Sequence, residues 1–270
     1  MSEEPKEEEK EHDPQKSYET ILEQEIRTGQ TELERPAKGL LLSGLSAGLD
    51  VSFSLLLMAA LTTLAEGRLP HPVVEILVAN AYAVGFLFVV LGRSELFTEH
   101  TTLAVLPVID GRSSVGRLVR LWGLVYAANL TGAAAFAAAA ALIGPALRIA
   151  EPRAFAKIAS GLVEHPSWVI LASAVLAGWL MGLLSWLVAA SRDTIGQIVL
   201  VWLVALTIGL LHLHHVVVGT AEVLAGVFSG QGATFPDFLR FLGLAPAGNI
   251  LGGVLFVALI KYGHASRHGS

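Results

Sequence analysis

Apolar residues along the chain fall into six long segments that short polar stretches separate. The segments cover residues 39–65, 73–108, 114–143, 166–190, 195–228 and 238–262. A helix needs about 20 residues to cross the roughly 30 Å hydrocarbon core of a bilayer, and every segment reaches that length. The pattern therefore predicts an all-α integral membrane protein with six transmembrane helices.

Two of these segments are the wrong length for a simple span. Residues 73–108 and 195–228 are each too long for one tilted helix and too short for two helices with a loop. A polar run interrupts the first segment at residues 92–100, and two short polar runs interrupt the second at residues 212–215 and 219–222. Non-helical backbone survives at membrane depth only where protein or a water-filled cavity satisfies it. Helices 2 and 5 are therefore predicted to be broken.

The chain also carries signs of an internal repeat. An Asn-x-x-Gly sequence begins at Asn129 and again at Asn249, each time in the span after a broken segment. Thr98 precedes the first asparagine by 31 residues and Thr220 precedes the second by 29. Three spans per copy would make the repeat inverted. This three-plus-three arrangement is typical of transporters, with the substrate site near the midplane between the two breaks.

Composition supports a lipid environment and adds a polar tail. The chain is 53% hydrophobic and 15% charged, with a mean hydropathy of +0.62. Residues 1–38 carry twelve acidic and six basic side chains, which accounts for the net charge of −5 and gives no indication of nucleic-acid binding. Within this tail, Tyr18, Ile21, Leu22 and Ile26 follow helical spacing. We expect either an amphipathic surface helix or a loosely ordered extension there.

The predicted domain layout follows from these features. Residues 1–38 form an acidic cytoplasmic tail, residues 39–262 the transmembrane domain and residues 263–270 a C-terminal tail. An even number of crossings places both termini on one side, and Lys and Arg are more frequent beside the spans on that side. We therefore expect a multi-pass protein of the cell (inner) membrane with cytoplasmic termini. The chain has no cysteine, so a disulfide or a thiolate metal site is excluded.

Three stretches resemble one known family. They are Glu95-Leu96-Phe97-Thr98, the span from Trp122 to Gly132, and the run from Pro246 to Gly253. In this order and at these separations they resemble the formate/nitrite transporter family over residues 38–262. The resemblance implies an aquaporin-like protomer of six helices, assembled as a homopentamer with one pore per protomer. Members pass formate, nitrite, hydrosulfide, lactate or related anions, and several couple to a proton through a central histidine, which corresponds to His215 here.

The chain departs from that family at three positions. The family asparagine four residues after the central histidine is Gly219 here. The basic residue that many members place at the start of helix 4 falls on Leu162, with Lys157 nearby but out of register, and a second family asparagine falls on Gly178. The chain therefore resembles a divergent branch of the family.

The candidate pore residues are the motif residues and the ionisable groups at the two breaks. They are Arg93, Glu95, Leu96, Phe97, Thr98, Asn129, His214, His215, Glu222 and Asn249. A charged group in hydrocarbon costs several kcal/mol, so ionisable residues inside spans are candidates for function by default. The alternative is that Arg93 and the glutamates form ion pairs that hold the broken helices together.

Individual roles can be assigned within this set. Neighbours in a helix lie about 100° apart, so His212, His214 and His215 cannot all face one lumen. We expect His215 to be the pore group, with His214 as the alternative and His212 hydrogen-bonded within the bundle. Arg93 is the candidate replacement for the missing lysine. Leu96 and Phe97 would form an apolar constriction or else pack as ordinary helix residues.

The sequence thus predicts a channel or transporter for a small monovalent anion or its conjugate acid. The expected partners are the solute, the bilayer and further copies of the chain, in a pentamer by family resemblance. No cofactor, metal or enzymatic activity is expected. The alternatives are a neutral-solute pore, a structural protein with a sealed lumen and, as a poorer match, an intramembrane metalloenzyme that uses the three histidines with Glu222.

Overall fold

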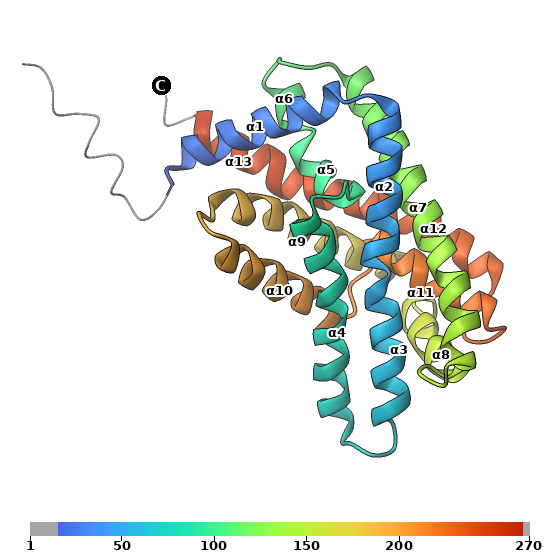
Figure 1. Ribbon diagram of the computed structural model, residues 1–270. Coiled ribbons are helices and arrows are strands. Elements are labelled where there is room, and N and C mark those ends of the chain that lie inside the picture. Colours follow the sequence, from blue (N-terminus) through green and yellow to red (C-terminus); the bar gives the residue numbers. More distant parts are fainter. Residues whose placement is uncertain (1–15, 267–270) are drawn as a thin grey trace, which may run out of the picture.

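The computed structural model describes residues 16–266, and every element in this range is a helix (Figure 1). Residues 1–15, which hold much of the predicted acidic tail, and residues 267–270 lie outside the described part. The helices are α1 (Tyr18–Glu34), α2 (Ala37–Val51), α3 (Phe53–Ala65), α4 (His71–Gly92), α5 (Phe97–Leu103), α6 (Leu106–Ile109), α7 (Val115–Ala146), α8 (Pro152–Val163), α9 (Ser167–Ala190), α10 (Thr194–Leu210), α11 (Val216–Phe228), α12 (Phe235–Gly253), a π-helical turn (Val254–Leu259) and α13 (Ile260–Ser266).

Five continuous helical stretches are long and apolar enough to cross a membrane. They are Ala37–Ala65, His71–Gly92, Val115–Ala146, Ser167–Ala190 and Phe235–His264. The remaining predicted span is divided between α10 and α11, which are shorter apolar helices. The all-α membrane fold is thus confirmed, and both predicted breaks are present, after α4 and after α10.

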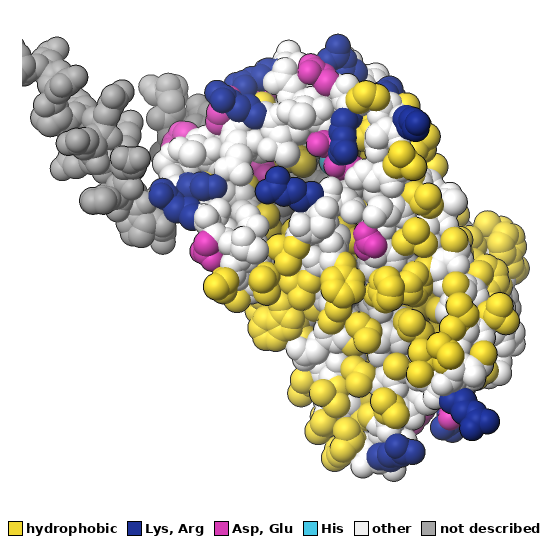
Figure 2. All heavy atoms as spheres, in the orientation of Figure 1, with side chains coloured by type: hydrophobic (Ala, Val, Ile, Leu, Met, Phe, Trp, Pro, Cys, Tyr) yellow, Lys and Arg dark blue, Asp and Glu magenta, His cyan; other side chains and the backbone are white. Residues whose placement is uncertain are grey.

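The surface is that of a protein whose solvent is lipid. Figure 2 shows hydrophobic side chains in a broad band across the molecule, with Lys and Arg gathered toward its two ends. Large apolar side chains on this surface are well exposed, among them Leu142 and Ile195 at 75% and Trp168 at 72%. Contiguous apolar surface on this scale indicates contact with membrane or with other chains.

Helices α1 and α13 lie side by side at one end of the molecule (Figure 1). The Tyr18 hydroxyl donates a hydrogen bond to the Lys261 carbonyl at 2.8 Å. Helix α1 buries Ile21, Leu22 and Ile26 against the bundle and exposes its charged face. The two ends of the described chain therefore lie on the same side, which we call the proximal side; the opposite end is the distal side.

The two halves of the bundle are built around equivalent close helix contacts. Helix α2 packs against α7, and α9 packs against α12. A Cβ atom on Gly48 would lie 2.2 Å from the carbonyl oxygen of Asn129, and one on Gly178 would lie 2.2 Å from that of Asn249. Only glycine fits such an approach of two backbones.

The breaks after α4 and α10 have the same backbone form. Arg93 and His212 end their helices in the left-handed conformation, with φ of 55° and 49°. The amide of Ser94 then bonds back to the Val89 carbonyl, and the amide of Leu213 bonds to that of Ile208. These bonds satisfy carbonyls that the end of a helix leaves free. At each break the long helix therefore ends and the backbone crosses a short extended stretch. A second half-helix, α5 or α11, then begins.

Asn129 and Asn249 hold the two extended stretches in equivalent ways. Asn129 accepts from the Phe97 amide at 2.8 Å and donates to the carbonyls of Gly44 and Glu95. Asn249 accepts from the Val216 amide at 2.9 Å and donates to the carbonyls of Ala174 and His214. Each amide thus makes three buried hydrogen bonds between three segments.

These bonds correct the register predicted for the repeat. They make Phe97 equivalent to Val216, so Leu96 corresponds to His215 and Thr98 to Val217. The predicted pairing of Thr98 with Thr220 is wrong. The two halves are aligned correctly by the backbone groups that each asparagine binds, and not by the matching threonine residues in the sequence.

Candidate functional site

The half-helices α5 and α11 begin close to each other in the middle of the bundle. Thr98 lies in the first turn of α5, and His215 is the residue that caps α11. The Thr98 Oγ1 and His215 Nε2 atoms are 2.7 Å apart, and both side chains are buried. The structure therefore brings together two predicted pore residues that are 117 residues apart in the chain.

The hydrogen bonds of His215 define how its ring is protonated. Its Nδ1 atom accepts from the backbone amide of Val218 at 3.3 Å, which caps the first turn of α11. A nitrogen that accepts carries no hydrogen, so the neutral ring has its hydrogen on Nε2 and donates it to the Thr98 hydroxyl. The Phe86 ring packs edge-on at 5.1 Å and covers the imidazole. His215 is thus built as a neutral hydrogen-bond donor.

The other two histidines have separate partners. His214 is buried between the Ser173 hydroxyl, 2.8 Å from Nδ1, and the Leu162 carbonyl, 2.9 Å from Nε2. His212 is exposed on the distal side and pairs with Glu75 at 2.9 Å. Within residues 16–266, no three His, Cys, Asp or Glu side chains are grouped so as to hold a metal. The structure therefore does not bring the histidines together as the metalloenzyme alternative requires.

Leu96 and Phe97 lie beside this central contact and are both buried. Leu96 occupies the capping position of α5, as His215 does in α11. The Phe97 ring packs on Tyr126, with centroids 4.8 Å apart, and on Trp122 at 6.2 Å. In this structure Leu96 and Phe97 pack as core residues beside the Thr98–His215 contact.

A cavity of about 500 Å³ opens on the proximal side, beneath α1. We call it the proximal vestibule. Its lining includes Arg93, Glu95, Glu99 and His100 from the first break, together with Arg35 from the connection between α1 and α2. Thr98 and His215 are not among its lining residues, so the vestibule ends short of the central contact.

The ion pairs in the proximal vestibule differ from those that the sequence suggested. Arg35 pairs with Glu95, which also bonds to His100, and Arg35 contacts Glu32 at 2.9 Å as well. Arg93 lines the vestibule and forms no ion pair with a described residue. Sequence reasoning missed Arg35 because it lies 60 residues from Glu95, outside any span. The sequence feature that could have identified Arg35 is its position before Pro36, at the start of the first span.

Helix α1 places another carboxyl group at this vestibule. Glu25 is 5% exposed and accepts a hydrogen bond from the Ser185 hydroxyl of α9 at 2.6 Å. Burial raises the pKa of Glu25 to about 7, against the opposing effect of the Ser185 hydrogen bond. The exposed Glu23 behaves in the opposite way, because hydrogen bonds from Arg112 and Arg27 lower its pKa to about 2. Glu25 therefore changes charge near neutral pH and Glu23 does not.

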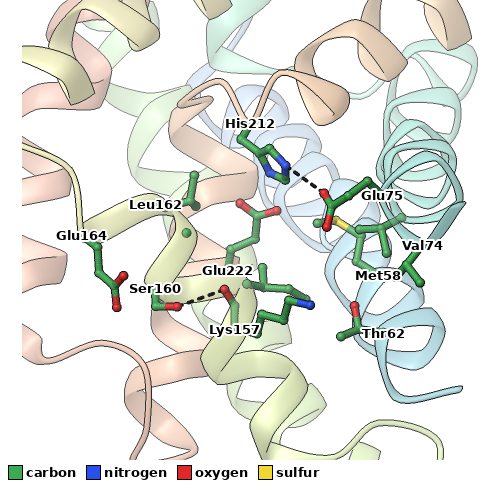
Figure 3. A pocket seen from close by; sticks show the side chains of 13 residues that line it. Met58, Thr62, Val74, Glu75, Lys157, Ser160, Leu162, Glu164, His212 and Glu222 are labelled. Carbon is green, nitrogen blue, oxygen red and sulfur yellow. Dashed lines mark hydrogen bonds and ion pairs between the residues drawn. The ribbon is translucent and has the colours of Figure 1, made fainter. Parts of the chain in front are cut away.

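A second cavity, of about 290 Å³, opens on the distal side. Figure 3 shows this distal vestibule, with Glu222 of α11 directed into it between Leu162, Lys157 and the pair formed by His212 and Glu75. Glu222 is only 4% exposed. Neither Thr98 nor His215 lines this cavity. Thr98 adjoins Glu99, which lines the proximal vestibule, and His215 caps the helix whose Glu222 lines the distal one, which places the contact between lining residues of the two vestibules.

The structure explains two of the departures from the family pattern. A Cβ atom on Gly219 would lie 2.4 Å from the Phe241 ring, so the volume of the usual asparagine is occupied by an aromatic side chain. At Gly178 the backbone of Asn249 takes the space. Leu162 belongs to α8, a separate helix before Pro166 rather than the start of the fourth span, and it lines the distal vestibule.

The family of this chain is shown by comparison with known proteins. The family model described as formate/nitrite transporter matches residues 19–263. The inner membrane protein YfdC of Escherichia coli (strain K12) is 36% identical over 87% of this chain and 74% of its own length. A probable formate transporter of Methanothermobacter thermautotrophicus is 32% identical, over 80% of this chain and 85% of its own. The protein belongs to the formate/nitrite transporter family.

Solved structures share the fold. A channel titled "FNT family ion channel" superposes with a TM-score of 0.80 over 91% of this chain and 98% of its own, at 21% identity. A pentameric formate channel with formate bound gives 0.70 over 85% of this chain and 97% of its own, also at 21% identity. The protein therefore shares its fold with these two solved channels.

Proposed function

We propose that the protein passes a small monovalent anion, or its conjugate acid, across a cell membrane through the Thr98–His215 contact. The observation that carries this proposal is the position of that contact between two vestibules that open on opposite sides. A solute that leaves one vestibule for the other has to separate the two side chains. Relatives described as a probable formate transporter and as the nitrite transporter NirC of Salmonella typhimurium support a small anion as the solute.

The chemistry of the contact suits an anion. His215 donates its Nε2 hydrogen to a neutral hydroxyl, and an anionic oxygen is a stronger acceptor than a hydroxyl. The beginning of α11 adds the positive end of a helix dipole at the same place. We infer that the solute replaces Thr98 as the acceptor of His215 and that Leu96 and Phe97 exclude bulk water around it.

The same geometry limits His215 as a source of protons. A ring that gives a proton and remains neutral has to start as an imidazolium, with a hydrogen on both nitrogens. A hydrogen on Nδ1 would remove the bond that caps α11. We therefore propose that His215 acts mainly as a hydrogen-bond donor to the passing solute.

Arg93 is proposed to concentrate anions in the proximal vestibule. It lines the cavity without an ion pair to a described residue, whereas Arg35 is neutralised by Glu95 and Glu32. A fixed positive charge raises the local concentration of anions and leaves neutral solutes unaffected. In keeping with the relatives, we further propose a homopentamer in the inner membrane with cytoplasmic termini.

Flux into liposomes that contain the pure protein tests the proposed function. We expect uptake of at least one of formate, nitrite, hydrosulfide, acetate and lactate above that of protein-free liposomes. Arg93→Gln should lower anion uptake about threefold at low salt and leave glycerol uptake unchanged. Uptake of glycerol with none of the anions would instead establish a neutral-solute pore, and no uptake of either would support a sealed protein.

A further inference from the structure

Glu222 is a buried carboxyl group that has no hydrogen-bond or ion-pair partner among residues 16–266. It is 4% exposed, and it makes no hydrogen bond or ion pair with any residue that the structure describes. Its carboxyl group is directed into the distal vestibule (Figure 3). Buried polar groups are nearly always hydrogen-bonded, so one that faces a cavity without a protein partner indicates a ligand or water there.

The charged groups around Glu222 are already neutralised by others. From α8, Lys157 pairs with Glu66 at 3.3 Å, and from the second break His212 pairs with Glu75 of α4 at 2.9 Å. Glu164, after α8, is exposed at the edge of the cavity. Tyr82 of α4 is buried and cannot supply a positive charge. Helices α7 and α12, which also pack on α11, contribute no lining residue, so no free cation faces Glu222 among the described groups.

An unpaired carboxyl group in such a place is best held with its proton. Ionised carboxylates away from water cost several kcal/mol without a counter-ion, and the protonated group costs much less. Leu162, which lines the same cavity, is apolar and offers Glu222 no counter-charge.

We propose that the distal vestibule binds a small carboxylic acid and that Glu222 exchanges a proton with it. This inference rests on the proposed function and names its substrate class. A carboxyl group donates and accepts at the same time, so it can bind a second carboxyl group through two hydrogen bonds. The cavity of about 290 Å³ has room for a small acid and several waters.

The proton step is simple and balanced. A carboxylate anion accepts the Glu222 proton on one oxygen, so the O–H bond of Glu222 breaks and one forms on the solute. The solute continues toward His215 as the neutral acid. Glu222 remains as a carboxylate until it takes a proton from hydronium at the open end of the vestibule. Passage in the other direction reverses each step. His215 lies seven residues before Glu222, two helical turns or about 10 Å along α11.

The test compares formate with nitrate, an anion of similar size whose acid is too strong to be formed here. Flux of both is measured in proteoliposomes from pH 5 to pH 8, after subtraction of protein-free liposomes. Wild-type protein should pass formate faster at lower pH and exclude nitrate. Glu222→Gln should lower formate flux at least tenfold and flatten its pH dependence, with nitrate still excluded. Glu222→Asp should retain part of the pH dependence, and Glu151→Gln, at an exposed carboxyl group that lines neither vestibule, should match wild type.

Two results would overturn the inference while the proposed function stands. If the pH profile of formate flux is unchanged in Glu222→Gln, Glu222 does not exchange a proton with the solute and has only a structural role. A rise of formate and nitrate flux together in Glu222→Gln would show an ionised carboxylate that repels anions. Absence of flux of every anion in wild type would instead refute the proposed function.

An infrared measurement keeps the inference testable if Glu222→Gln assembles poorly. Wild-type protein at neutral pH should show the C=O stretching band of a protonated buried carboxyl group, and formate should shift it. The band should move in Glu222→Asp. An identical, formate-insensitive band in wild type and Glu222→Asp would overturn the assignment.

Discussion

His215 combines two roles at opposite edges of one ring. Its Nδ1 edge caps α11 through the Val218 amide, and its Nε2 edge contacts the Thr98 hydroxyl, where we propose that the solute passes. A capping side chain has to accept a hydrogen bond, whereas a group that binds an anion has to donate one. Neutral imidazole does both at once. This explains how a histidine can both start a half-helix and face the solute.

A substitution of His215 distinguishes its hydrogen-bonding role from the proton exchange proposed for Glu222. Asparagine is a good helix cap but is too short to reach Thr98, so His215→Asn should keep the assembly intact. We expect anion flux to fall about tenfold, which corresponds to one lost hydrogen bond of about 1.4 kcal/mol. The pH dependence of the remaining flux should stay, because Glu222 is unchanged.

The control for this prediction is the exposed His212. His212→Asn should change flux little, because that ring lies at the surface beside Glu75. Stopped-flow uptake of formate between pH 5 and pH 8 measures both variants. If His215→Asn abolishes the pH dependence, the central histidine is the proton donor after all.

At the scale of elements, the sequence predicted where the helices break but did not predict the interactions that stabilise the breaks. Polar runs inside two overlong apolar segments predicted the interruptions after α4 and α10 correctly. Helix α8 was missed because its twelve residues are amphipathic and too short to read as a span. The link from Arg35 to Glu95 could not be predicted, since it joins residues far apart in the chain whose approach only tertiary packing sets.

Asn129 and Asn249 should be equally important to the two breaks. Each makes three buried hydrogen bonds, so replacing either by alanine removes the side-chain partner of one amide and one carbonyl in the extended stretch, and of one carbonyl in a neighbouring helix. We expect Asn129→Ala and Asn249→Ala each to lower the free energy of unfolding by about 2–4 kcal/mol. Asn80→Ala, at an exposed hydrogen bond to Trp202, should have little effect.

Thermal unfolding in mild detergent measures these losses of stability. A large loss for one asparagine and none for the other would mean that the two breaks are not equivalent. The matching hydrogen bonds of Asn129 and Asn249 would then not contribute equally to the free energy of unfolding.

The docking of α1 should depend on pH through Glu25. Its pKa of about 7 in the docked helix exceeds its ordinary value of 4.5, so the docked state binds the proton more tightly. This contribution, at most about 3 kcal/mol, is complete below pH 4.5 and is lost as the pH rises through 7. The hydrogen-exchange protection factors of residues 18–34, which correct for the rise of intrinsic exchange with pH, should therefore be higher at pH 5 than at pH 8.

The matched variants for this prediction lie on the same helix. Glu25→Gln should remove most of the difference between pH 5 and pH 8. Glu23→Gln should leave it unchanged, because the lowered pKa of Glu23 keeps that carboxyl ionised throughout this range. Equal protection factors at both pH values in the wild-type protein would contradict a titrating Glu25 at this contact.

At the scale of the whole molecule, the complete proposed path lies within one chain. Both vestibules, the Thr98–His215 contact and Glu222 come from helices of the same protomer. Gly248 and Gly252 of the last span pack closely against α9 inside the protomer. They are therefore not free to form contacts between copies. The broad exposed apolar band is what remains for lipid and for neighbouring protomers.

A pentamer with one path per chain makes a quantitative prediction for mixed assemblies. Five chains of 28.5 kDa give about 143 kDa, which native mass spectrometry in mild detergent should detect as the main species. Pentamers assembled from wild-type and His215→Asn chains should lose flux in proportion to the fraction of variant chains, because each protomer conducts independently. A path shared along the fivefold axis would instead lose most of its flux when a minority of chains carries the substitution. A monomer with full activity would contradict the pentamer and leave the proposed path within one chain intact.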